Sequence, residues 1–461
     1  MPSKLSHGND LSRIECGSRF GHGFMNAPSA HSVRSHVIEA LKRYWPEGRL
    51  FIERLCVPRA APDRGENIPP AVTLVRLPDW AADCGVDGRI LVPAFTVIEG
   101  KGPRWRNTDW FYAAFWMLNG SAEREYERRH GPIHSYACKL RGWNPLLWRH
   151  AWVNRIALFL RRWAAREKMG DEQALMGPMP RHRIMLTHDV DAVSKTMAIR
   201  LKRSCFLAYN ALKSCCDPNK KDFSKYIREM ACYLASSDDY WCFDHITDIE
   251  KQYGVNSIFF LYAGAHSNRR TLKTKLLDPC YDVADARVRR KLRQLRDAGW
   301  KVGLHPSFEA WKDSGRIYRE RRYLEKQLAL PITSCRQHWL RFSWKKTWPA
   351  QIKAGIEMDY TLGFNDRPGF RTSAALIYRP LFADSDDVAE FWAAPLLLMD
   401  SQVYDYQLLE DTQRFNMIDA YIREVIQVHG EASILWHQRT LSADYNWGAG
   451  YIRVLDMLGG N

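Results

Sequence analysis

The second half of the chain alternates short apolar runs with longer amphipathic stretches. Apolar runs bounded by Gly, Pro or polar residues predict buried strands at 184–187, 257–262, 301–304, 334–338, 395–399 and 433–436. Between these runs, apolar residues recur at helical spacing over 243–253, 285–298, 317–328, 347–354 and 415–429. Strands that alternate with helices imply a parallel sheet covered by helices, either open or closed into a barrel.

The first half has a less regular pattern. A short helix is predicted at 36–44, and strands broken by Pro are predicted at 71–77 and 90–97. The stretch TDWFYAAFWMLNG, residues 108–120, predicts a helix that begins at a Thr or Asp cap and ends at Gly120.

The clearest helix of the first half covers residues 148–168. Trp152, Ile156, Phe159 and Trp163 follow one another at helical spacing and share one face. Because this apolar stripe has ordinary width, we expect it to pack on the barrel. Peripheral contact with a membrane through the same rings is the alternative.

A break rich in Gly and Pro, GDEQALMGPMPRH, covers residues 170–182. We expect a domain boundary there. The predicted organisation is a poorly ordered N-terminus over 1–30, a smaller α+β domain over 31–180 and the larger α/β domain over 181–461.

Two aspartates follow the first predicted strand of the larger domain. Asp189 and Asp191 are two residues apart, so along a strand their side chains point the same way. Two carboxylates that point together repel each other unless a proton or a metal ion lies beside them. In parallel α/β folds the carboxyl ends of strands carry the chemistry. The alternative is that both aspartates cap the following turn in solvent.

Histidines end two further predicted strands. KVGLH closes on His305 and ILWH closes on His437. A single His after a strand is usually a structural residue. Two His and two Asp at the strand ends of one α/β unit would instead meet at one rim, as a hydrolytic metal site requires.

The order of these blocks resembles a known family. LTHDVD, SIFFLYAG, AGWKVGLHPS, CRQHWLRFS, AGIEMDYTLGFNDRPGFR, PLLLMDS and ILWH are similar to the ordered motifs of NodB-like polysaccharide deacetylases, carbohydrate esterase family 4. The resemblance covers roughly residues 183–455, and TDWFYAAFWMLNG and HGPIHSYA more weakly resemble the segment before this domain in a bacterial subgroup. The resemblance implies a distorted (β/α) barrel with a smaller mixed α+β domain before it. It also implies that the protein removes acetyl groups from sugars.

The resemblance also assigns roles to particular residues. Asp189 matches the general base of the family, and Asp191 matches its metal-binding aspartate. His305 matches the first metal-binding His, and His437 matches the general acid. Arg336 matches the Arg that orients the base. The implied cofactor is a divalent metal ion, with zinc as the first choice.

One position departs from the family. The family places a second metal-binding His four residues after the first, where this chain has Glu309. Glu309, His338 at the end of the RQH strand and His266 after SIFFLYAG are the alternatives for the third ligand. His188 points away from the aspartates if the strand is regular. The site is therefore either remodelled or defective.

These observations leave two main functions open. The first is a metal-dependent hydrolase that removes acetyl groups from an N-acetylated or O-acetylated sugar or polysaccharide. The second is a catalytically defective glycan-binding or scaffold protein that retains the deacetylase barrel. Each has a carbohydrate or sugar-conjugate partner.

Composition adds limits to this reading. The 461 residues carry a net charge of +15, which fits a nucleic-acid, membrane-surface or anionic-glycan partner. The basic stretch DARVRRKLRQLRDAG lacks an accompanying base-stacking or zinc-finger motif, so we favour a solvated outer helix over a nucleic-acid patch. A basic nucleic-acid-binding protein is the further, less favoured alternative. The odd number of Cys, 11, and the absence of an apolar leader or spanning segment favour a cytoplasmic protein. The oligomeric state stays open.

Overall fold

The computed structural model describes residues 30–459 except for 64, 66–67, 216–222, 238, 265–276, 382–389 and 408. Residues 1–29 of the N-terminus that we expect to be poorly ordered lie outside the described residues. His266, one alternative for the third metal ligand, lies outside them as well.

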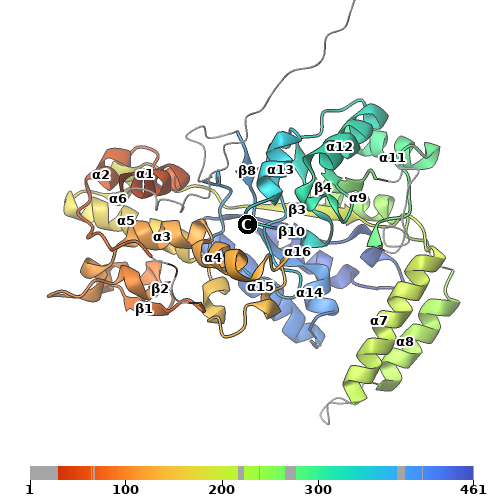
Figure 1. The fold of residues 1–461 in the computed structure, drawn as a ribbon, viewed down its shortest axis with the longest axis horizontal. Coiled ribbons are helices and arrows are strands. Elements are labelled where there is room, and N and C mark those ends of the chain that lie inside the picture. The colour runs from red at the N-terminus through yellow and green to blue at the C-terminus, as the bar shows by residue number, and fades with distance from the viewer. Residues whose placement is uncertain are drawn as a thin grey trace, which may run out of the picture.

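The N-terminal part packs helices on one side of an antiparallel pair of strands (Figure 1). Its elements are α1 Ala30–Ala40, α2 Arg49–Arg54, β1 Val72–Arg76, β2 Arg89–Pro93, α3 Trp110–Leu118, α4 Ser121–His130, α5 Trp152–Glu167 and α6 Glu172–Met176. Helix α3 begins where the sequence predicts, because the side chain of Asp109 accepts a hydrogen bond from the Tyr112 N–H at 2.9 Å.

Helix α5 buries the stripe of rings that the sequence places on one face. Trp152, Phe159 and Trp163 are each at most 4% exposed. The ring of Phe159 packs 5.0 Å from that of Trp110, and both lie in the N-terminal part. The membrane alternative is therefore wrong for this helix. The barrel contacts mainly its first turn, where Asn154 exchanges two hydrogen bonds with the Ala375 backbone.

The second half forms one eight-stranded sheet in which every ladder is parallel. The strands lie in the order β8-β7-β6-β5-β4-β3-β10-β9. Their bounds are β3 Arg183–Val190, β4 Ile258–Tyr262, β5 Lys301–His305, β6 Ser334–Cys335, β7 Met358–Asp359, β8 Trp392–Ala393, β9 Leu396–Met399 and β10 Glu431–Leu435. The predicted parallel sheet is confirmed.

The two edges of this sheet are joined by the chain itself. Only Ala394 and Pro395 separate β8 at one edge from β9 at the other. The Leu396 N–H also donates to the Leu362 carbonyl, 2.8 Å away, so the segment after β7 lies against β9. The sheet is thus rolled, which confirms the distorted (β/α) barrel.

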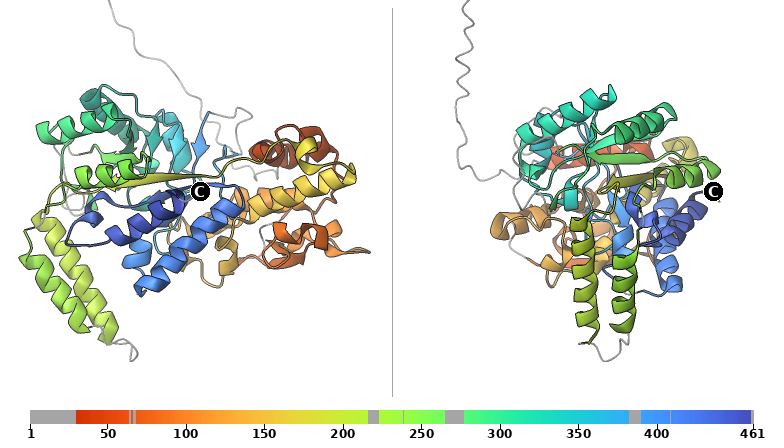
Figure 2. Two further views of the ribbon diagram at one scale, coloured as in Figure 1. Left: turned by 180° about the vertical axis from the view of Figure 1, so that it is seen from behind. Right: turned by 90° about the vertical axis from the view of Figure 1, so that its right-hand side faces the viewer.

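The helices of the second half are α7 Met197–Cys215, α8 Phe223–Ala235, α9 Phe243–Gln252, α11 Ala286–Asp297, α12 Ser314–Leu328, α13 Thr347–Lys353, α14 Asp400–Tyr404, α15 Asp411–Gln427 and α16 Gly448–Gly459. Most of them cover the outside of the sheet, whereas α7 and α8 project from it (Figure 2). Helix α11 carries the basic stretch, and it buries only Val288, Leu292 and Leu295. This is the solvated outer helix that the sequence predicts.

The N-terminal part and the barrel share one hydrophobic core. Ion pairs join the two parts as well: Arg155 of α5 donates to Glu424 of α15 at 2.7 and 2.8 Å, and buried Arg371 pairs with Glu123 of α4. Arg371 belongs to the GFNDRPGFR loop, which therefore packs against the N-terminal part. The division at residues 180 and 181 stays a prediction.

In the described part of the chain, no helix combines the length and the apolar character needed to cross a bilayer.

Candidate active site

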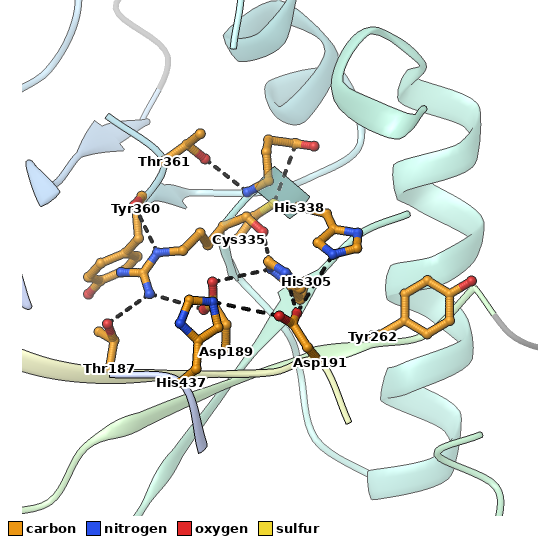
Figure 3. Close-up of polar contacts among 12 residues, drawn as sticks. Thr187, Asp189, Asp191, Tyr262, His305, Cys335, His338, Tyr360, Thr361 and His437 are labelled. Atoms are coloured by element: carbon orange, nitrogen blue, oxygen red, sulfur yellow. Dashed lines mark hydrogen bonds and ion pairs between the residues drawn. The ribbon is translucent and has the colours of Figure 1, made fainter. Parts of the chain in front are cut away.

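The two aspartates of the first strand reach one cluster of side chains (Figure 3). Asp189 lies in β3 and Asp191 directly follows it. Their carboxylates approach opposite nitrogens of the same ring: Asp189 Oδ2 lies 3.8 Å from His305 Nδ1, and Asp191 Oδ1 lies 3.4 Å from His305 Nε2. His188, between them in sequence, points to the other face, where it contacts Glu250 at 2.9 Å. The alternation predicted from sequence is therefore present.

Asp189 is held by a buried guanidinium. Arg336, which follows β6 and is fully buried, donates to Asp189 Oδ1 at 3.0 Å. The same guanidinium donates to Thr187 Oγ1 at 2.8 Å and to the Tyr360 carbonyl at 3.1 Å. Because three acceptors from two segments, β3 and the residue after β7, fix it, Arg336 sets the orientation of the Asp189 carboxylate.

Asp191, His305 and His338 form a group that could hold a metal ion. One ligand atom from each lies within 4.8 Å of the others. Asp191 Oδ1 is 3.4 Å from His305 Nε2 and 3.7 Å from His338 Nε2. Two ligands that are each about 2.1 Å from a tetrahedral ion lie about 3.4 Å apart. The two distances from Asp191 are therefore compatible with a metal ion held by this group.

An unsatisfied atom supports this fit. Asp191 Oδ1 is buried, and no donor among the described residues forms a hydrogen bond to it. A buried carboxylate oxygen without a donor is costly, and a cation beside it would remove that cost.

Each imidazole turns its other nitrogen toward an oxygen, although among the described residues only that of His305 forms a hydrogen bond. His305 Nδ1 lies 2.8 Å from the Arg336 carbonyl, which turns Nε2 toward Asp191. His338 Nδ1 lies 3.5 Å from Asp278, whose carboxylate in turn accepts the Phe308 N–H at 2.7 Å. Metal-binding imidazoles almost always present their other nitrogen to a carbonyl or a carboxylate in this way.

The turn that carries His338 has an unusual backbone. His338 begins a 3-10 turn, His338–Leu340, directly after the short strand β6. Trp339 and Leu340 have φ angles of 56° and 46°, in the left-handed region that residues with side chains rarely adopt. Such conformations concentrate at functional sites, and here the turn directs His338 to the cluster.

The structure does not bring Glu309 to this group. Its carboxylate lies 3.3 Å from the Arg341 guanidinium and is 30% exposed. The prediction that Glu309 is a metal ligand therefore needs correction. Glu309 lies on the connector after β5, where its side chain points to Arg341. The third residue of the group with Asp191 and His305 is His338.

His437 is paired with a carboxylate that sequence reasoning missed. Its Nδ1 lies 2.7 Å from Asp400 Oδ1, and the His437 N–H donates to Asp400 Oδ2 at 2.8 Å. His437 Nε2 points toward Asp191, 3.6 Å from Oδ2. Burial alone would lower the pKa of His437, but the Asp400 carboxylate outweighs burial and raises it. The sequence contains a signal for Asp400, because it is the acidic residue that ends the apolar block PLLLMD.

Arg439 is a second residue that sequence reasoning missed. Its guanidinium forms an ion pair with Asp191 Oδ2, the oxygen not facing His338. Burial opposes ionisation of Asp191, but Arg439 and the neighbouring imidazoles outweigh it and hold the pKa of Asp191 well below its usual range. Asp191 therefore carries a negative charge beside Arg439 and the imidazoles of His305, His437 and His338.

The cluster lies at one rim of the barrel. Its members follow the carboxyl ends of five strands: Asp191 after β3, His305 in β5, His338 after β6, Asp400 after β9 and His437 after β10. The prediction that the aspartates and histidines gather at one rim is met by this geometry. The chemical roles of these residues are a separate question.

Comparisons with known proteins add only a likeness in fold. No family model matches the chain, and no curated protein matches it. Among solved structures, one named as a polysaccharide deacetylase from Mycobacterium smegmatis is 15% identical, covers 59% of this chain and 82% of its own, and has a TM-score of 0.36. The chitin deacetylase of the fungus Colletotrichum lindemuthianum is 11% identical, with 61% and 83% covered and a TM-score of 0.31.

A pseudoenzyme of carbohydrate esterase family 4 from Bacillus anthracis also resembles the chain. It is 12% identical, with 61% of this chain and 62% of the other covered and a TM-score of 0.26. The likeness is one of fold. TM-scores this low carry no argument by themselves, so the barrel rests on its own strand ladders and the site on its own contacts.

Proposed function

We propose that the chain is a metal-dependent hydrolase that removes acetyl groups from an N-acetylated or O-acetylated sugar or polysaccharide. One observation carries the proposal. The group Asp191, His305 and His338 is flanked by a carboxylate fixed by an arginine, Asp189, and by an imidazole fixed by a carboxylate, His437. A ligand group, a base and an acid at one rim are the parts that metal-assisted hydrolysis requires.

Asp191, His305 and His338 would hold the ion, and zinc fits the mixed oxygen and nitrogen ligands. When bound, such an ion polarises an acetyl carbonyl and makes a water molecule more acidic. The remaining steps belong to the chain's own side chains.

Asp189 takes the proton of the attacking water. Its Oδ1 accepts from Arg336 at 3.0 Å, which fixes the carboxylate plane and leaves Oδ2 on the side of His305. A positioned carboxylate of this kind contributes roughly 10²–10⁴-fold to the rate.

His437 donates a proton to the departing amine. Asp400 binds its Nδ1 and so directs the protonated Nε2 toward the cluster. Asp400 also raises the pKa of His437, which favours the protonated form that can donate.

The test uses the full chain with and without zinc. Acetate release is measured from N-acetylglucosamine oligomers and from O-acetylated xylan, and metal content is measured on the same samples. We expect one zinc ion per chain and zinc-dependent acetate release, which Asp189→Asn abolishes while it keeps the metal. A zinc-loaded protein that releases acetate from neither class of substrate would refute the proposal.

The catalytically defective glycan-binding or scaffold protein is the second candidate, and one contact favours it. Arg439 already neutralises the charge of Asp191, so this carboxylate would attract a metal cation less strongly. This candidate expects no bound metal in the wild type and glycan binding that Asp189→Asn leaves unchanged. It also expects Arg439→Ala to restore metal binding, because the substitution removes the competing charge.

A further inference from the structure

Helices α7 and α8 form a hairpin that projects from the barrel (Figures 1 and 2). Most of the large apolar side chains that are exposed in the described residues lie on it. They are Met197, Leu201, Tyr209 and Leu212 on α7, and Phe223, Ile227 and Leu234 on α8. Four of them are at least 60% exposed, namely Met197, Leu201, Tyr209 and Leu212. Gathered apolar exposure of this kind marks an interaction surface.

The exposed residues of α7 make a stripe that the hairpin does not use for its own packing. At about 100° per residue, Met197, Leu201, Tyr209 and Leu212 fall within roughly a third of the helix circumference. Leu207 and Ala211 lie on another side of the helix and are buried against residues of α8, among them Tyr226 and Tyr233. The stripe therefore needs no contact within the hairpin and is open to a partner.

The charge of the hairpin identifies the kind of partner. The sequences of α7 and α8 contain six Lys and Arg against one Glu, and α7 has no acidic residue. In the sequence, Lys202 follows Leu201 and Lys213 follows Leu212, so basic positions accompany the apolar ones. Apolar stripes accompanied by basic residues are typical of helices that lie in the surface of a bilayer containing anionic lipids.

The base of the hairpin is fixed to the rim that carries the candidate site. Lys195 and Asp444 form an ion pair of 2.7 Å in which both side chains are buried. Arg203 of α7 pairs with Asp405 at 2.9 Å. Asp191 precedes the start of α7 by only six residues. Whatever binds the hairpin is therefore held at a set position relative to Asp191.

We propose that the α7–α8 hairpin docks the protein on an anionic lipid surface through its exposed apolar stripe. Docking brings the rim of the barrel to sugars displayed at that surface. This last step rests on the proposed deacetylation, whereas the docking itself does not.

The test measures binding of the full chain to vesicles by co-sedimentation, without substrate. We expect binding to vesicles of phosphatidylglycerol and phosphatidylcholine, weaker binding to phosphatidylcholine alone, and loss of binding as salt shortens the screening length from about 10 Å to about 3 Å. The variant that combines Leu201→Glu with Leu212→Glu should bind at least tenfold less. Leu50→Glu is the matched control, because Leu50 is 61% exposed but lies on α2.

Thermal unfolding of each variant verifies that it is folded, since all three positions are exposed. Unchanged vesicle binding by the folded double variant would overturn the proposal, and so would equal loss of binding in Leu50→Glu. The wild type could instead form a dimer without lipid and not bind vesicles. If the double variant were then monomeric, the stripe would be assigned to contact with a second copy of the chain. Because no substrate is present, failure of docking and failure of deacetylation are observed separately.

Discussion

His338 Nε2 lies 3.7 Å from Asp191 Oδ1, whereas Glu309, four residues after His305, lies 3.3 Å from the Arg341 guanidinium. His338 comes from the turn after β6, whereas a second His four residues after His305 would come from the connector after β5. The third residue of the group therefore comes from the segment after a neighbouring strand.

This arrangement predicts that substitutions of His338 and Glu309 have opposite effects on zinc binding. His338→Ala should lose zinc, because loss of an orienting partner already costs roughly 10–100-fold in metal affinity and loss of a ligand costs more. Glu309→Gln should keep zinc, since its carboxylate faces Arg341. Metal content after dialysis against a weak chelator distinguishes them. Zinc loss in Glu309→Gln with retention in His338→Ala would reverse the ligand assignment.

Substitution of the two aspartates should affect metal binding and catalytic rate differently. Asp191→Asn should lose metal, because an amide is a poorer ligand than a carboxylate. Asp189→Asn should keep the metal and lose roughly 10²–10⁴-fold in rate, because only the proton acceptor is removed. Zinc stoichiometry and acetate release are measured on both folded variants. Equal metal loss in the two would show that their roles are assigned wrongly.

Asp400 should act only through His437. Asp400→Asn and His437→Ala should both retain zinc and slow release of an amine, because the proton donor is misplaced or missing. Hydrolysis of 4-nitrophenyl acetate should be nearly unaffected, because its leaving group needs no proton. A variant that slows both substrates equally would instead indicate a general loss of structure at the rim.

Much of the barrel could be predicted because its central strands are buried on both faces. Such strands appear in the sequence as continuous apolar runs, and β3, β4, β5, β9 and β10 were predicted within about three residues of their observed bounds. Strands β6, β7 and β8 have two residues each. The predicted strand at 334–338 extends three residues beyond β6, and β7 and β8 were not predicted. Helices α7 and α8 were missed because their apolar residues lie on both packed and exposed faces.

The candidate site was predictable only where local alternation decides it. The common direction of Asp189 and Asp191 follows from the strand period, and so does the opposite direction of His188. Whether Glu309 or His338 joins Asp191 and His305 depends on the left-handed turn at Trp339. No local sequence pattern predicts that turn. Asp400 and Arg439 gain their roles from contacts between neighbouring strand ends, which a single sequence does not contain.

The ion pair between Arg155 and Glu424 joins the N-terminal part to the barrel, and it predicts how stability depends on pH. Burial alone would raise the pKa of Glu424, but His150 and Arg155 outweigh burial and lower the pKa to about 2 from 4.5. A carboxyl whose pKa is lower in the folded state stabilises the fold above its unfolded pKa. The contribution of Glu424 should therefore be complete above about pH 5. It should be lost as the pH falls toward 2.

A shift of this size corresponds to on the order of 3 kcal/mol. Urea unfolding at pH 6 and at pH 3 measures the contribution in the wild type and in Glu424→Gln. The wild type should lose more free energy of unfolding between these two pH values than the variant does, because the amide does not titrate. Glu431→Gln is the control, since Glu431 of β10 also pairs with an arginine of the N-terminal part, Arg43, in a more exposed ion pair. An equal pH dependence in the wild type and Glu424→Gln would show that this ion pair does not link the two parts energetically.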